Sequence, residues 1–407
     1  MKNWRRLGMK SEWTKKKLSD IADFNPRETI KKGAIAKKIS MDVLRPFYRD
    51  IPYYVEECFS GGTKFRNGDT IMARITPCLE KGKTAQVSIL NDGEVGFGST
   101  EYIVFRAKEG IVDKDYLYYL VCSPEVREPA IKSMVGSSGR QRVQTDVVKN
   151  LEIDVPPLVE QEKIGSFLKA FDDKIALNDR INKNLEQQAQ AIYRSWFVNY
   201  EPFDGTKPDD WSDGTIDDLG TEIICGKTPS TKKSEYYGGN TPFITIPDMH
   251  GCVYIVSTER YLSDAGVASQ PKKTLPPNTV CVSCIGTAGL VTLVSEESQS
   301  NQQINSIIPK EGISVYYIYL LMQTLAETIN KLGQSGSTIV NLNKTQFGKI
   351  QVMIPSKRVL QDFDSLCRPL FDTILSNQKE NINLSELRDT LLPKLMSGEL
   401  DLSDIDL

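Results

Sequence analysis

Several short motifs in the sequence come close to patterns that bind a metal or a phosphate. Cys281 and Cys284 form a Cys-x-x-Cys pair, but a zinc site needs further ligands, and the chain has one histidine, His250, and no second close cysteine pair. Gly220 and Gly226 enclose five residues where a P-loop has four, so the backbone N–H groups would not close around a phosphate. We therefore predict a buried strand at the cysteines, no metal site and no nucleotide site.

The motifs of hydrolases, methyltransferases and nucleases are also incomplete. Asn25-Pro26-Arg27 is the nearest approach to the Asn/Asp-Pro-Pro-aromatic loop that holds a flipped adenine. Pro208-Asp209 could begin a nuclease motif, but no Glu-x-Lys follows before residue 240. His250 could belong to a Ser/His/Asp hydrolase site, but the chain has no Gly-x-Ser-x-Gly motif to supply the nucleophile. We expect the chain to have no catalytic residues and no cofactor of its own.

Polar loops remain, and their side chains suit base edges and phosphates. Arginine can pair bidentately with guanine, asparagine and glutamine with adenine, and lysine with phosphate. One such residue in a loop is commonly just solvated, but here sets of them recur in both halves of the chain. The candidate DNA-binding residues are Arg74, Thr76, Lys81, Lys83, Arg140, Gln141, Arg142, Lys227, Thr228, Ser230, Thr231, Ser283, Thr287, Asn301, Gln302, Gln303, Ser337 and Thr338.

The two sets of loops belong to an internal repeat of half the chain. In each half a tryptophan, Trp13 or Trp211, lies five residues before a short apolar run that contains aspartate. Strand-like runs, a Gly/Ser-rich loop and a short strand that ends in proline follow in the same order. The matching segments are 67–75 and 277–285, 109–121 and 311–322, 136–144 and 333–341, and 151–157 and 350–355.

After each proline-ended strand the apolar period changes to that of a helix, and each helix can extend for about 40 residues, or about 60 Å. The same stripe occurs twice at an offset of 199 residues. A narrow stripe of this length favours a helical partner, and the other copy is the obvious one. The alternative is two separate amphipathic helices, each packed on its own half. The stripe residues are Ile164, Leu168, Phe171, Ile175, Asn178, Asn182, Leu185, Ala189, Ile192 and Trp196, then Phe363, Cys367, Leu370, Ile374, Asn377, Asn381, Leu384, Arg388, Leu391 and Leu395.

Each stripe is interrupted by two asparagines. If the helices are antiparallel, Asn178 faces Asn381 and Asn182 faces Asn377, so that each amide meets an amide. A buried asparagine in such a seam lowers stability and sets the register of the two helices. We therefore predict that these four asparagines determine the coiled-coil register.

Composition and charge restrict the class of protein. The chain of 407 residues is 40% hydrophobic and 25% charged, which is typical of a soluble globular protein with two or three domains. Neither a signal peptide nor a membrane span is apparent, and the scattered cysteines suit a reducing compartment, so we expect a cytoplasmic protein without membrane contact. The net charge is +6 over residues 1–155, 0 over 156–199, −5 over 200–355 and −4 over 356–407. Only the first segment has the basic charge expected of a nucleic-acid-binding protein.

Three longer passages resemble the family of DNA-specificity (S) subunits of Type I restriction-modification systems. They are VPPLVEQEKIGSFLKAFDDKI at 155–175, CGKTPSTKKSEYYGGNTPFITIPDM at 225–249 and LRDTLLPKLMSGEL at 387–400, and the resemblance covers nearly the whole chain. It implies two target-recognition domains, each reading one half of a split target in double-stranded DNA, with the helices as an antiparallel coiled-coil ruler. The sequence departs from the family at the second helix start, where Leu360-Gln361 replaces Glu160-Gln161.

The resemblance also implies the partners. The helices would dock two methyltransferase (M) subunits, and two restriction (R) subunits would complete the enzyme. S-adenosylmethionine, ATP and magnesium would then belong to those partners. This chain would be the non-catalytic specificity subunit of a Type I restriction endonuclease and adenine-N6 DNA methyltransferase.

We therefore expect an α/β (α+β) fold with an internal pseudo-repeat, in which two globular recognition domains are separated by two long helices that form an antiparallel coiled coil. Two alternatives are a self-contained restriction or modification enzyme and a coiled-coil scaffold that binds no nucleic acid. The expected limits are 1–155 for the first recognition domain, 156–199 for the first spacer helix, 200–355 for the second recognition domain, 356–400 for the second spacer helix and 401–407 for an acidic tail.

Overall fold

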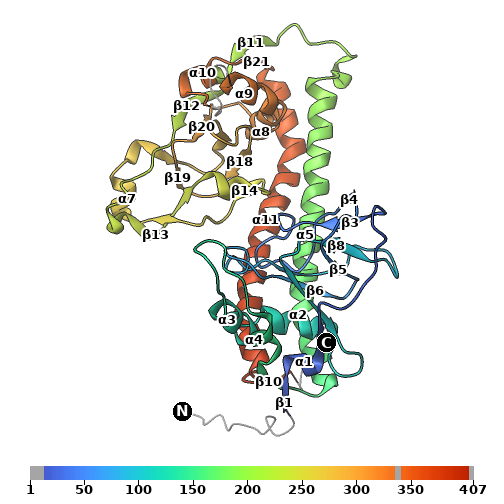
Figure 1. The fold of residues 1–407 in the computed structure, drawn as a ribbon. Helices are drawn as coiled ribbons and strands as arrows, with labels where there is room; N and C mark the ends of the chain where they lie inside the picture. Colours follow the sequence, from blue (N-terminus) through green and yellow to red (C-terminus); the bar gives the residue numbers. More distant parts are fainter. Residues whose placement is uncertain (1–12, 335–340, 403–407) are drawn as a thin grey trace. The chain divides into compact units, whose positions relative to one another are not determined.

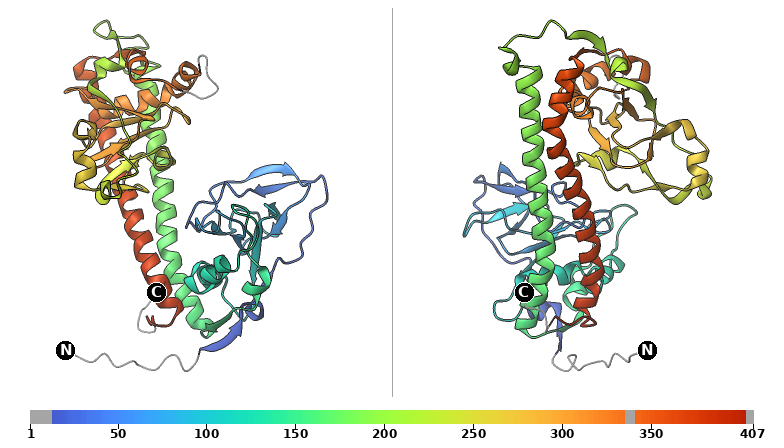
Figure 2. Two further views of the ribbon diagram at one scale, coloured as in Figure 1. Left: turned by 60° about the vertical axis from the view of Figure 1, so that its left-hand side comes forward. Right: turned by 180° about the vertical axis from the view of Figure 1, so that it is seen from behind.

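The computed structural model describes residues 13–334 and 341–402, so residues 403–407 of the expected acidic tail lie outside the described part. The chain divides into two compact units, one of Met1–Ala176 with Ile382–Leu407 (unit 1) and one of Leu177–Asn381 (unit 2). Two helices of 40 residues, α5 (Leu158–Phe197) and α11 (Lys357–Met396), each contribute one stretch to each unit. In each unit, a stretch of α5 (green) lies beside a stretch of α11 (red), and the sheets lie to one side of them (Figure 1; Figure 2).

Unit 1 combines a β-rich domain with four short helices. Its strands form two four-stranded sheets, β2-β9-β6-β7 and β4-β3-β8-β5, and a two-stranded ribbon of β1 and β10. The elements are β1 (Thr14–Lys17), α1 (Leu18–Ile21), β2 (Ala22–Phe24), β3 (Ile35–Ile39), β4 (Val55–Cys58), β5 (Thr63–Phe65), β6 (Thr70–Ala73), β7 (Thr84–Gln86), β8 (Gly96–Gly98), β9 (Tyr102–Ala107), α2 (Lys114–Cys122), α3 (Pro124–Lys132), α4 (Thr145–Lys149) and β10 (Glu152–Val155).

Unit 2 has the same plan with one additional strand. Its sheets are β12-β20-β17-β18-β14 and β15-β13-β19-β16, and its ribbon is formed by β11 and β21. The elements are η1 (Glu201–Phe203), β11 (Ser212–Thr215), α6 (Ile216–Leu219), β12 (Gly220–Cys225), η2 (Ser234–Tyr236), β13 (Tyr237–Ile244), η3 (Ile246–Met249), β14 (Tyr254–Ile255), β15 (Tyr261–Leu262), α7 (Asp264–Ala268), η4 (Pro271–Lys273), β16 (Thr274–Leu275), β17 (Val280–Ser283), β18 (Val291–Val294), β19 (Ser298–Ser300), β20 (Ile304–Pro309), α8 (Val315–Thr324), α9 (Ala326–Gly333), α10 (Lys344–Gly348) and β21 (Gln351–Ile354).

The strand pairings confirm the predicted repeat and the mixed α/β fold. The order β2-β9-β6-β7 corresponds to β12-β20-β17-β18, and the parallel pair β3 and β8 corresponds to the parallel pair β13 and β19. In both units the first strand pairs antiparallel with the last strand before the long helix, β1 with β10 and β11 with β21. Each repeat is thus a complete domain whose two ends meet in one ribbon.

The long helices complete the core of each unit. Ile164 and Leu168 of α5 are buried with Leu395 of α11 in the core of unit 1. Tyr193 and Phe197 of α5 share a core with α11 in unit 2, where the Phe197 ring lies 4.8 Å from the Phe363 ring. The helices therefore pack both on each other and on the domains. No helix among the described residues combines the length and the apolar character that a membrane crossing requires.

The predicted stripe is correct along much of its length but is shifted by one residue at several positions. Ile192, Trp196 and Leu391 are half-buried, and their neighbours Tyr193, Phe197 and Leu392 are buried. Phe171 and Leu370 are only half-buried, whereas their neighbours Asp172 and Phe371 are 5% and 0% exposed. A helix that packs on a partner helix and on a domain buries a wider face than a two-helix seam, and its period of 3.6 residues drifts from the heptad. The stacking of Phe371 on Tyr316 of α8, with ring centroids 4.4 Å apart, belongs to this wider face.

The four asparagines pair as an antiparallel arrangement requires. In unit 2, Asn178 Nδ2 donates to Asn381 Oδ1 at 2.8 Å, and Asn377 Nδ2 donates to Asn182 Oδ1 at 2.8 Å. Asn178 is fully buried, and its Oδ1 receives no hydrogen bond from the residues that the structure describes. An unsatisfied buried carbonyl lowers stability, which fits a side chain kept for register, and that role stays a proposal.

The sequence difference between the starts of α5 and α11 changes how each helix is bonded to its domain. In α5, the buried Gln161 accepts from Asp113 N at 2.9 Å and donates to Pro156 O at 2.9 Å and Ile111 O at 3.3 Å. The predicted match of Gln161 with Gln361 is shifted by one residue, because the two helices start 199 residues apart and the equivalent of Gln161 is therefore Leu360. Leu360 is buried but cannot make these hydrogen bonds. Glutamine therefore connects the helix start to its domain in unit 1 alone.

Candidate nucleic-acid interface

Two of the predicted loops of the first domain lie together in unit 1. Thr76 N donates to Gln141 O at 3.0 Å, and Val143 N donates to Arg74 O at 2.9 Å, so the loop after β6 pairs with the Gly/Ser-rich loop. Arg74 N in turn donates to Glu101 O at 2.9 Å. These backbone contacts place the side chains of Arg74, Glu101 and Arg142 close together.

Glu101 joins the two arginines of this cluster. Arg142 Nε donates to both carboxylate oxygens at 3.0 Å, and its Nη2 donates to Oε1 at 2.7 Å. Arg74 Nε lies 3.4 Å from Oε2 of the same carboxylate. The hydrogen bonds from Arg142 hold the pKa of Glu101 below its usual range, although burial opposes this. The cluster is thus ionised at neutral pH and has one net positive charge.

The other candidate side chains of the first domain differ in their exposure and in their hydrogen-bond partners. Arg140 and Lys81 are exposed, and neither side chain makes a hydrogen bond or ion pair within the described residues. Lys83 is half-buried, and its Nζ donates to Met41 O at 2.8 Å. Thr76 Oγ1 contacts Met134 Sδ at 3.7 Å. Arg140 and Lys81 can therefore reach a phosphate, whereas Lys83 is held in place.

The second domain builds the same backbone framework at the equivalent place. Cys284 N donates to Gln303 O at 2.8 Å, and Leu342 N donates to Cys284 O at 3.0 Å. Isolated bridges link Ile285 with Asn341 in unit 2 and Ile75 with Arg142 in unit 1. Cys284, Gln303 and Asn341 thus take the places that Arg74, Glu101 and Arg142 have in the first domain.

Amides and hydroxyls replace the charges in this second cluster. Gln303 Oε1 accepts from Asn301 Nδ2 at 3.0 Å, and Gln302 Oε1 accepts from Thr228 Oγ1 at 2.8 Å. Lys227 N donates to Ser300 O at 2.8 Å, which joins the loop after β12 to the end of β19. The exposed candidates of this domain are Lys227, Ser230, Thr231, Thr287 and Gln302.

Several predicted site residues do not lie on an open surface. Ser283 is 0% exposed, and its hydroxyl accepts from Leu290 N at 2.8 Å. It therefore stabilises the loop and is not accessible to DNA. Asn301 is 8% exposed and supports Gln303. Ser337 and Thr338 lie outside the described residues. The prediction for Ser283 is thus wrong in this structure, because the strand that carries it is buried.

Two cluster members, Glu101 and Asn341, were not among the predicted site residues. Glu101 was missed because an acidic side chain does not bind phosphate and its ion pairs join distant parts of the sequence. Asn341 ends the second Gly/Ser-rich loop, and its equivalence to Arg142 at the offset of 199 residues was the signal that could have identified it.

Comparison with known proteins agrees with this duplicated architecture. The family model for the type I restriction modification DNA specificity domain matches residues 10–187 and 208–381, which is more than half of the chain. The chain belongs to this specificity family. It is 31% identical to the type I restriction enzyme HindI specificity subunit of Haemophilus influenzae, over 96% of this chain and 100% of that protein.

Other members of the specificity family are more distant. The type I restriction enzyme MjaIX specificity subunit of Methanocaldococcus jannaschii is 26% identical over 73% of this chain and 71% of that protein. The crystal structure of the type I restriction-modification S subunit from M. genitalium matches with a TM-score of 0.58 at 16% identity, over 97% of this chain and 98% of that one, which supports the fold. This chain is a type I specificity subunit with two recognition domains.

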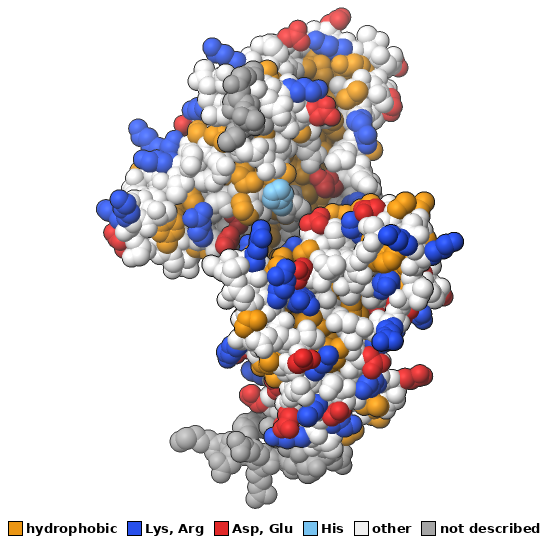
Figure 3. Space-filling view, viewed as in Figure 1, with side chains coloured by type: hydrophobic (Ala, Val, Ile, Leu, Met, Phe, Trp, Pro, Cys, Tyr) orange, Lys and Arg blue, Asp and Glu red, His pale blue; other side chains and the backbone are white. Residues whose placement is uncertain are grey.

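The charges of the specificity subunit are dispersed. On the face shown in Figure 3, basic and acidic side chains are interspersed over unit 1.

Among the described residues, His, Cys, Asp and Glu form no group of three that could hold a metal ion. Cys281 lies on the buried strand β17 and Cys284 directly follows it, and burial raises the pKa of both thiols to about 12.

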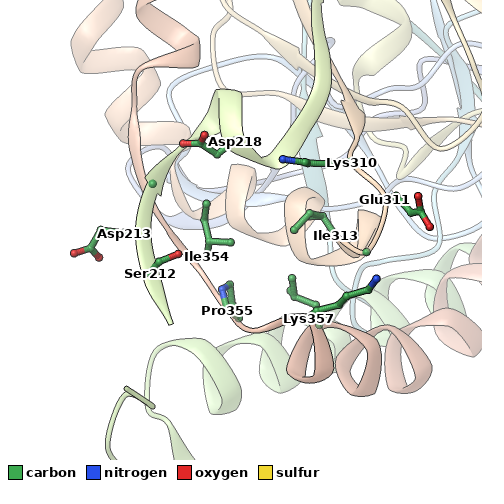
Figure 4. Close-up of a pocket in the computed structure, with 12 residues that line it drawn as sticks. Ser212, Asp213, Asp218, Lys310, Glu311, Ile313, Ile354, Pro355 and Lys357 are labelled. Carbon is green, nitrogen blue, oxygen red and sulfur yellow. The ribbon is translucent and has the colours of Figure 1, made fainter. Parts of the chain in front are cut away.

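A cavity of about 450 Å³ lies in unit 2 between β11, the turn at 310–313 and the start of α11. Figure 4 shows the side chains of Asp218, Lys310 and Lys357 around it. The Asp218 carboxylate is already occupied, because Oδ2 accepts from Thr215 N and Thr215 Oγ1 at 2.8 Å. Leu360 lines the cavity at the position where Gln161 bonds the equivalent turn in unit 1. Leu360 thus contributes an apolar wall to the cavity and no hydrogen bond to the turn.

Proposed function

We propose that this specificity subunit recognises a bipartite target in double-stranded DNA, with each recognition domain reading one half. The observation that carries the proposal is the loop cluster built twice, by the same backbone hydrogen bonds, on two equivalent domains. Both clusters contain side chains of types that pair with base edges, Arg142 in the first and Gln303 and Asn341 in the second. Two similar readers with different side chains suit a target whose halves differ in sequence.

The long helices would set the spacing between the half-sites and dock the methyltransferase subunits. Support for the first role comes from their equal length of 40 residues and from the asparagine pairs. Support for the second comes from large apolar side chains left exposed on the helices, which include Leu177, Leu366 and Leu387 at 44%, 49% and 48% exposure. A methyltransferase subunit that packs on the helices would cover these side chains.

The chemistry of restriction and modification would lie in the partner subunits. We propose two methyltransferase and two restriction subunits, which would bind S-adenosylmethionine, ATP and magnesium, with this chain as the non-catalytic subunit. The names of the relatives support this division, because they are specificity subunits of type I restriction enzymes. Partners that also contact the duplex would supply the phosphate contacts for which an acidic second domain is poorly suited.

Exchange of the domains tests the proposal. Residues 13–155 are replaced by the equivalent domain of a relative with a different target, and methylation by the complex with methyltransferase subunits is mapped across a genome. One half of the recognised sequence should change while the other half and the gap are retained. The reciprocal exchange of residues 211–355 is the matched control and should change only the other half. A change of both halves in either chimera contradicts the two-reader arrangement.

A further inference from the structure

Resting on the proposed function, we propose that Glu101 is a positioning residue that presents Arg142 to a guanine in the half-site read by the first domain. A guanidinium group has five N–H donors on two usable edges. Glu101 takes the edge formed by Nε and Nη2. The edge that contains Nη1 has no partner among the described residues, and it can make the bidentate contact to guanine O6 and N7.

The exposure of the pair supports a role beyond a structural ion pair. The Arg142 side chain is 44% exposed while Glu101 is 22% exposed, so the carboxylate lies behind the arginine and the arginine reaches outward. A charged group held by a bidentate contact loses little further side-chain entropy when it binds. Arg74 contacts the same carboxylate and, at 33% exposure, adds positive charge beside the reading edge.

The second domain provides an internal comparison. At the equivalent places it has Gln303 and Asn341, on a framework with the same backbone hydrogen bonds. Gln303 has no charge that would pair with an arginine as Glu101 does. The place of Arg142 is taken by Asn341, so this cluster also has no arginine to position. The guanine-reading device is therefore specific to the first domain, and the second half-site should not depend on it.

The test uses the full chain in complex with its methyltransferase subunits and a duplex library in which each position of the target is randomised in turn. The variants are Glu101→Ala, Glu101→Gln, Arg142→Ala and Arg140→Ala. Glu101→Ala and Arg142→Ala should each lose about ten- to hundred-fold of the preference for a G·C pair at the same position of the first half-site. Glu101→Gln keeps an oxygen that accepts from Arg142 and should retain part of that preference.

Arg140→Ala is the matched control, because Arg140 lies two residues from Arg142 in the same loop and has no carboxylate partner. It should weaken binding to all sequences alike, as expected for a phosphate contact. The preference at the second half-site should be the same in all four variants. If Glu101→Ala weakens binding equally for every sequence, and base preference is unchanged in Glu101→Gln as well, Glu101 is a structural ion pair only and the inference is wrong. A wild-type complex without preference at either half-site would instead contradict the proposed function itself.

Discussion

Arg388 is a buried arginine at a place in α11 where the repeat has Ala189 in α5. It forms an ion pair with Asp172, and Tyr119 Oη donates to the other oxygen of that carboxylate at 2.5 Å. Both charged side chains are below 10% exposed, and burial raises the pKa of Asp172 even with Arg388 beside it. Arg388→Ala would leave this carboxylate buried without its cation, so we expect the free energy of unfolding to fall by about 3–5 kcal/mol. Denaturant unfolding followed by circular dichroism measures this loss.

Arg368→Ala is the control for that measurement. Arg368 also lies on α11 and pairs with Asp364 one turn away, but its side chain is 60% exposed. Solvent screens such a pair, so its removal should cost about 1 kcal/mol or less. A loss for Arg388→Ala as small as that expected for Arg368→Ala would mean that the buried pair does not stabilise unit 1. Arg388 is the one charged residue among the predicted stripe positions, but its partner could not be predicted from the sequence, because Asp172 is 216 residues away.

At the scale of the element, the start of each long helix can be tested with the same substitution. Gln161→Leu would leave the N–H of Asp113 and the carbonyls of Pro156 and Ile111 without their side-chain partner. Lost hydrogen bonds to buried groups cost about 1–3 kcal/mol, and we expect a loss in that range by thermal unfolding. Gln361→Leu on α11 is the matched control and should be nearly neutral, because Gln361 is exposed. A loss as large for Gln361→Leu would mean that the hydrogen bonds of Gln161 do not account for the effect of the substitution.

Local patterns predicted the elements well, and contacts between distant segments explain what they missed. The change of period after Pro157 and Pro355 predicted two helices of about 40 residues, and both are present. The position of Phe171 was wrong because the packing of a domain on the helix widens its buried face. For the candidate site, composition identified the loops, but the pairing of Glu101 with Arg142 depends on a strand and a loop 41 residues apart.

At the scale of the whole molecule, the proposed ruler predicts a change in target spacing. Seven residues added to each long helix beside the asparagine pairs, in heptad phase, lengthen the helix pair by about 10 Å, or about three base pairs. The bases of each half-site should stay the same while the preferred gap grows, as measured by methylation mapping. The variant Asn178→Leu with Asn381→Leu keeps the length and should keep the gap. An unchanged gap in the lengthened, active complex would show that helix length does not set the spacing.

The ribbons that close the two domains have a consequence for the gene. Because β1 pairs with β10 and β11 pairs with β21, the ends of each domain lie on neighbouring strands, about 5 Å apart. A foreign domain encoded between these ends has to be joined to the rest of the chain at only two points. It has to keep only one short pair of strands. In-frame recombination within the codons for 14–17 and 152–155, or for 212–215 and 351–354, would therefore replace a whole recognition domain. The codons of both long helices would stay unchanged. One such event would give the descendants a new target, while the helices inherited from the ancestor are unchanged.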